Sequence, residues 1–64
     1  MLTHAQEQLI QAIRDCLKHG HEAEARETIY EQVQDCYGSI RWYRTLKMDV
    51  PRNVKEYLRQ LKRL

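Results

Sequence analysis

The sequence predicts an all-α fold, and three observations lead to that class. Two glycines and one proline among 64 residues leave few breaks, which favours long helices over many short strands. Apolar residues recur every three or four positions along most of the chain, which is the spacing of one helix face. Hydrophobic residues make up 42% and charged residues 31% of the composition, as in folded chains. At this length we expect one helical domain, residues 1–64.

The first helix is expected over residues 3–19. Thr3 and Gln6 have the spacing of a capping box at its start. Gly20 suits the left-handed position after a helix end because it has no Cβ atom. The apolar residues between them fall on one side at about 100° per residue: Ala5, Leu9, Ala12, Ile13, Cys16 and Leu17.

A second helix is expected over residues 22–37. Its apolar stripe consists of Ala25, Ile29, Val33, Cys36 and Tyr37. The connection to the first helix is short, so we expect the two helices to form an antiparallel hairpin. The outer face of this second helix is acidic and carries Glu24, Glu27, Glu31 and Asp35.

Residues 38–50 leave two structures open. Gly38 can end the second helix, with Ser39 capping a short further helix. Alternatively the second helix continues to about residue 48, because one glycine costs a helix only about 1 kcal/mol. The apolar residues Trp42 and Tyr43 lie about 100° round from the earlier stripe. We favour the break at Gly38, and the fold then has three or four helices.

The last helix, expected over residues 51–64, separates apolar from positive side chains. Asp49 can cap it, and Pro51 suits the first turn, where no N–H group is needed. Its apolar stripe consists of Val54, Tyr57, Leu58, Leu61 and Leu64. Its positive residues share another arc of about 100° that extends about 16 Å along the axis: Arg52, Lys55, Arg59, Lys62 and Arg63.

The positive charge gathers in the second half of the chain. Residues 1–37 hold three Lys or Arg and seven Asp or Glu, whereas residues 38–64 hold eight and two. Such a chain presents a basic surface to an anion or pairs with another acidic surface, including its own. We expect the last helix, together with Arg41 and Arg44, to contact nucleic acid or an acidic protein partner.

A helix-turn-helix can be tested on residues 34–47, with Gly38 in the turn. Gln34 stands where close helix packing needs a small residue, and Arg44 stands where a buried aliphatic residue is needed. The fit is poor, and the sequence offers no other element that reads bases. Nucleic-acid binding is therefore the alternative to protein contacts rather than the first prediction.

The chain is also expected to form a homo-oligomer. Every predicted helix has an apolar stripe, and a chain of 64 residues is too short to cover them all. The residues that we assign to self-association are Val54, Tyr57, Leu58 and Leu61. We expect Trp42 and the four tyrosines to pack in a core or interface rather than to stack on a ligand.

The sequence predicts no enzyme, no cofactor and no metal. Cys16, His19, His21 and Cys36 lack zinc-finger spacing, and the hairpin would hold the two cysteines far apart. There is no Gly-rich phosphate loop and no nucleophile–base–carboxylate set. No apolar run exceeds two residues, so we expect no membrane segment, and a cytoplasmic location with reduced thiols.

The stretch CYGSIRWYRTLKMDVPRNVKEYLRQLKRL, residues 36–64, gives the chain its likeness to a known group. The chain resembles the small early-region proteins that lambdoid phages encode between their exonuclease and excisionase genes. The resemblance covers length, the hairpin-like first half and the basic tail. It implies an all-helical, oligomeric, non-enzymatic accessory protein that acts in the bacterial cytoplasm on phage development. It assigns no functional residues. The partner that we expect for such a protein is a host or phage protein.

Overall fold

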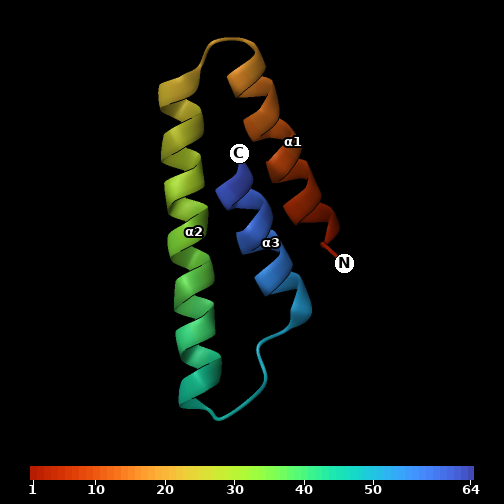
Figure 1. Ribbon diagram of the computed structural model, residues 1–64, viewed down its shortest axis with the longest axis vertical. Coiled ribbons are helices and arrows are strands. Elements are labelled where there is room, and N and C mark those ends of the chain that lie inside the picture. The colour runs from red at the N-terminus through yellow and green to blue at the C-terminus, as the bar shows by residue number, and fades with distance from the viewer.

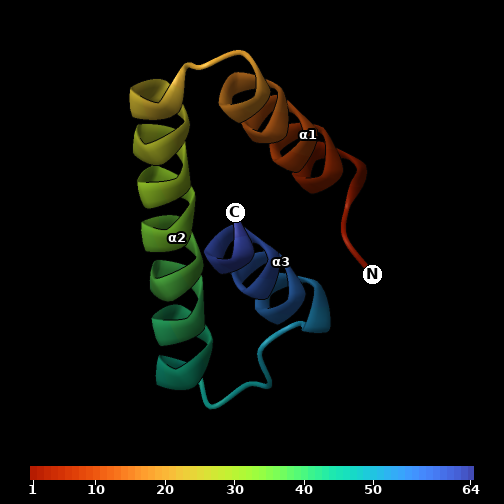
Figure 2. The ribbon, with the colours of Figure 1, turned by 45° about the horizontal axis from the view of Figure 1, so that its top comes forward.

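A computed structural model describes all 64 residues and contains three helices and no strand. The predicted all-α class is confirmed. The helices are α1, His4–Lys18, α2, Glu22–Thr45, and α3, Arg52–Arg63. In Figure 1, α1 leads up to a turn and α2 leads down from it, while α3 lies between them. Both α1 and α3 lie on the same side of α2, which is the longest helix (Figures 1 and 2).

The ends of α1 form as the sequence predicts. The Thr3 hydroxyl accepts a hydrogen bond from the Gln6 backbone N–H at 3.1 Å, and the Gln6 side chain accepts one from the Thr3 N–H at 2.9 Å. These bonds satisfy two N–H groups that have no partner within the helix. Gly20 has φ of 82°, so its expected left-handed conformation is also confirmed.

Helix α2 runs through Gly38 without interruption and ends at Thr45. The predicted break at Gly38 is wrong, and the alternative of one long helix is correct. Cys36 is buried before the glycine, and Ile40 and Tyr43 are partly buried after it. Burial on both sides outweighs the cost of about 1 kcal/mol for one glycine in a helix.

A linker of residues 46–51 reverses the chain and leads into α3. Lys47 in this linker has φ of 56°, which is the left-handed conformation. Pro51, not Asp49, is the N-cap residue, and no side chain caps the helix. The predicted cap is wrong because Pro51, with φ of −55° and an extended ψ of 141°, already places the following residue in the helix. Asp49 is two residues too early to reach the free N–H groups.

All three helices contribute to one small core. Six residues are buried, two from each helix: Ile10, Ile13, Ala25, Cys36, Tyr57 and Leu61. Partly buried side chains surround them, including Ile29, Val33, Val54 and Leu58. The core therefore fixes the rotation of α3 about its own axis, with the Tyr57 and Leu61 side directed inward.

Candidate anion-binding surface

The five positive residues predicted for the last helix are exposed on α3: Arg52, Lys55, Arg59, Lys62 and Arg63. At 100° per residue they lie opposite Tyr57 and Leu61, which are buried. Burying that apolar pair requires the positive side to face outward. We call these five residues the cationic arc.

No carboxylate of the chain forms an ion pair with the cationic arc. The chain contains two ion pairs, Glu22 with Arg26 at 3.7 Å and the Met1 amine with Glu56 at 2.7 Å. Glu56 is the one acidic residue of α3. The hydrogen bond from the amine, followed by its positive charge, lowers the pKa of Glu56. The charges of Arg59 and then Arg52 lower the pKa of Glu56 further, but neither arginine forms an ion pair with it.

A shallow hollow lies within the cationic arc. Its walls are Arg52, Lys55 and Arg59, together with Glu56. Three cations around one open hollow give a positive potential that favours carboxylate or phosphate oxygens. No hydrophobic residue lines the hollow and it is open, so it suits contact with an anionic group on a macromolecule rather than enclosure of a small molecule.

Tyr37 connects the cationic arc to α2. The Lys62 ammonium group lies 5.1 Å from the centre of the Tyr37 ring, within cation–π distance. Arg41 and Arg44 follow Tyr37 by four and seven residues, so these three side chains lie on one side of α2. Both arginines are exposed. At 100° per residue, Arg44 lies close to Tyr37 on the side of α2 that Lys62 approaches, whereas Arg41 lies nearer the side that faces away from α1 and α3.

Apolar side chains are exposed at the C-terminal end of α2 and in the linker. Trp42 is 58% exposed, Leu46 47% and Met48 55%. The Trp42 ring meets the Tyr43 ring edge-to-face, with centroids 5.1 Å apart. Trp42 therefore does not pack in the core of the single chain, because α2 extends past the buried residues. Packing in an interface, the other part of the prediction, stays a prediction.

The residues predicted to mediate self-association lie in the core of the single chain instead. Tyr57 and Leu61 are buried, and Val54 and Leu58 are partly buried beside them. Tyr57 also donates a hydrogen bond from its hydroxyl to the Gln32 side-chain oxygen at 2.9 Å. Tyr57 and Leu61 therefore cannot contact a second copy while this fold is kept.

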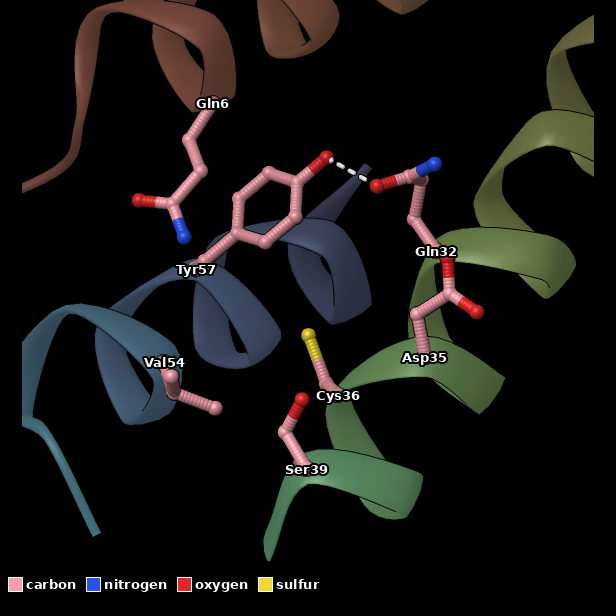
Figure 3. Close-up of a pocket in the computed structure, with 7 residues that line it drawn as sticks. All are labelled: Gln6, Gln32, Asp35, Cys36, Ser39, Val54 and Tyr57. Carbon is pink, nitrogen blue, oxygen red and sulfur yellow. Dashed lines mark hydrogen bonds between the residues drawn. The ribbon is translucent and has the colours of Figure 1, made fainter.

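A small pocket opens beside this hydrogen bond, where the three helices meet (Figure 3). The Cys36 sulfur points into it from α2, and the Tyr57 ring borders it from α3. Burial, and then the nearby Asp35 charge, raises the pKa of the Cys36 thiol. Burial also raises the pKa of Tyr57, followed by the charges of Cys36 and Asp35. Both groups are therefore held protonated, and the thiol is a poor nucleophile.

The other sequence candidates do not assemble into a site. Helix α2 is unbroken through Gly38 and ends at Thr45, so the tested helix-turn-helix has no turn at Gly38. Cys16 and Cys36 are free thiols, and no three His, Cys, Asp or Glu side chains lie close enough to hold a metal ion. None of the helices has the length and apolar character needed to cross a membrane.

Comparison with family models, with curated proteins and with solved structures finds no match to this chain.

Proposed function

We propose that the protein is a non-enzymatic helical interaction module that binds an acidic protein partner through the cationic arc of α3. The observation that supports it is the outward placement of five cations with no ion-pair partner in the chain. A regulatory or accessory role of this kind, in a phage or bacterium, is what the resemblance to lambdoid early-region proteins implies.

A protein partner is favoured over other anions by the apolar side chains at the end of α2. Trp42, Leu46 and Met48 are exposed close together along the chain. Exposed apolar residues rimmed by charge are typical of protein interfaces, where aromatic residues, Met and Arg are enriched. The proposed partner therefore has an acidic surface for α3 and an apolar patch for the α2 end.

Single-stranded nucleic acid is the second candidate, and one observation favours it. The exposed Trp42 ring directly follows Arg41 in the stretch RWYR, about 100° from it round α2. Exposed rings with neighbouring cations can stack on bases while the cations track phosphates. This binding would not depend on base sequence, because no element of the fold resembles a groove-reading helix pair.

The test compares the wild type with Lys55→Glu/Arg59→Glu. In a pull-down from a bacterial extract, we expect this variant to lose the specific protein that the wild type retains, because two cations of the arc are reversed. Arg14→Glu/Lys18→Glu is the matched control, since it makes the same charge change on exposed positions of α1. The control is expected to retain the protein.

Gel shifts at two salt concentrations separate the two candidates. For a protein partner, neither single- nor double-stranded DNA shifts at low salt. For nucleic acid, affinity falls steeply with salt and is lost in the α3 variant. If the α3 variant binds every ligand as the wild type does, the cationic arc is not the binding surface.

A further inference from the structure

The outer side of α2 is covered by no other part of the chain. Both views of the ribbon place α1 and α3 on one side of α2, and its opposite side is open (Figures 1 and 2). The buried residues of α2 are Ala25 and Cys36. The outer stripe, defined here as Glu27, Tyr30, Gln34, Gly38 and Arg41, lies opposite them within an arc of about 80°.

The residues of the outer stripe are spaced symmetrically about Gln34, and the residues at equal distances from it differ in charge or size in a complementary way. Glu27 and Arg41 each lie seven residues from Gln34, in opposite directions. Tyr30 and Gly38 each lie four residues from it. All five residues are exposed, and neither Glu27 nor Arg41 forms an ion pair within the chain. The acidic Glu27 and the positive Arg41 thus lie at equal distances from Gln34. The large ring of Tyr30 and the glycine at position 38, which has no side chain, do so as well.

We propose that this stripe binds a second copy of the chain, with the two α2 helices antiparallel and Gln34 at the two-fold axis. At 1.5 Å per residue, Glu27 and Arg41 lie about 10 Å on either side of that axis. Antiparallel packing therefore sets each Glu27 opposite Arg41 of the second copy, and the pair occurs twice.

Gly38 supports close approach of two helices on this side. A glycine inside a helix is unfavourable, and within the single chain a Cβ atom at Gly38 would meet no atom within 4 Å. The monomer therefore gives no packing reason for a glycine there. In the antiparallel pair, Gly38 faces Tyr30 of the second copy, whose ring is 66% exposed in the monomer. The missing side chain leaves room for that ring.

Gln34 fixes the register of the pair. Its side-chain amide both donates and accepts hydrogen bonds, so two copies at the axis can bond to each other. A polar residue at one position of a helix pair specifies register in this way. The dimer does not use the cationic arc of α3, so it goes beyond the proposed function and would carry two such arcs.

Charge reversal with sedimentation equilibrium tests this pairing. We expect Glu27→Arg and Arg41→Glu each to weaken dimerisation by about tenfold or more, because each sets like charges opposite each other. The double variant restores opposite charges in reversed order, and its dimerisation is expected to return to near the wild-type value. Glu7→Arg and Arg14→Glu make the same charge changes on exposed positions of α1 and should leave dimerisation unchanged.

Gly38→Leu gives a test that does not depend on charge. Leucine fits the helix and meets no neighbour in the monomer, so helical content by circular dichroism should be kept. The added side chain separates the two helices, and we expect dimerisation to weaken by about tenfold or more. A wild type that is monomeric at high micromolar concentration overturns the proposal. So does a double charge reversal that fails to restore association, or association that depends on Trp42 and Met48 but not on Glu27.

Discussion

Tyr57 lies in the core and joins α3 to α2. Its ring is buried with Leu61, and its hydroxyl donates to Gln32 on α2. The sequence predicts correctly that Tyr57 lies on an apolar stripe, because helical periodicity shows which side of a helix avoids water. It does not show what covers that side. We assigned the stripe to a second copy, whereas α1 and α2 of the same chain cover it.

The thiol of Cys36 and the phenol of Tyr57 are buried, and we expect them to make the stability of the fold depend on pH. Both have a raised pKa in the fold, so the unfolded chain releases these protons at lower pH than the folded chain. The free energy of unfolding is therefore expected to fall as pH rises above about 8.5, where an unperturbed thiol ionises, and further above about 10 for the phenol. Denaturant titrations at several pH values measure this.

Two variants show which group causes each part of the loss of stability at alkaline pH. Cys36→Ala should remove the part that begins near the ordinary thiol pKa, and Tyr57→Phe should remove the later part. Tyr57→Phe should also lower the free energy of unfolding at neutral pH by about 1 kcal/mol, because the bond to Gln32 is lost. A stability that is flat over the alkaline range in the wild type would contradict this account.

Substitution of the two glycines by alanine is expected to change the free energy of unfolding in opposite directions. In the monomer Gly38 lies in a regular helix with open space around it, so at a concentration where the protein is monomeric Gly38→Ala should raise the free energy of unfolding by about 1 kcal/mol. Gly20 has φ of 82°, which alanine adopts with strain, so Gly20→Ala should lower that free energy by about 1 kcal/mol. Thermal unfolding of the two variants and the wild type measures the sign of each change in stability. Equal effects would mean that α2 bends or breaks at Gly38.

The helix ends differ in how far the sequence determines them. The capping box of α1 was predictable because both partners lie within four residues of each other. The start of α3 depends on the path of the whole linker, and there the fixed backbone of Pro51 takes the place that we gave to Asp49. The continuity of α2 likewise depends on burial of residues on both sides of Gly38, which local propensity does not contain.

Substitutions at Thr3 and Asp49 should show which of the two predicted caps stabilises its helix. Thr3→Ala removes an observed cap and is expected to lower the free energy of unfolding by about 1 kcal/mol. Asp49→Ala removes a side chain that caps nothing and is expected to change it by less than about 0.5 kcal/mol. Urea titrations of both variants provide the comparison. A large loss from Asp49→Ala would show that α3 begins earlier than Arg52.

The molecule as a whole is stabilised by a core that is small for three helices. Six residues are buried, and each helix supplies two of them. Leu61→Ala is therefore expected to cost about 2–5 kcal/mol, since it empties a fully buried position where α3 docks. The next residue gives the control: Lys62→Ala, on the cationic arc, should cost about 1 kcal/mol or less, mainly through loss of its contact with Tyr37. Comparable losses in both variants would mean that α3 does not pack as described.

The sequence could predict one part of the binding surface, namely that the positive residues of α3 lie on the side away from the core. Helical spacing alone placed the five cations of α3 on one arc, and the structure keeps that arc exposed and unpaired. The exposed Trp42, Leu46 and Met48 could not be predicted, because their exposure depends on how far α2 extends past α3. The identity of the partner likewise depends on a surface outside this chain.

Amide chemical-shift mapping by NMR gives the most direct test of the outward cationic arc. The probe is an acidic polypeptide, poly-glutamate, added to the wild-type protein at low salt. We expect the largest shifts at Arg52, Lys55, Arg59, Lys62 and Arg63 and at the adjoining Tyr37, and we expect them to shrink as salt is added. Shifts that are equally large around Arg14 and Lys18 of α1, or that are absent from α3, would contradict the account.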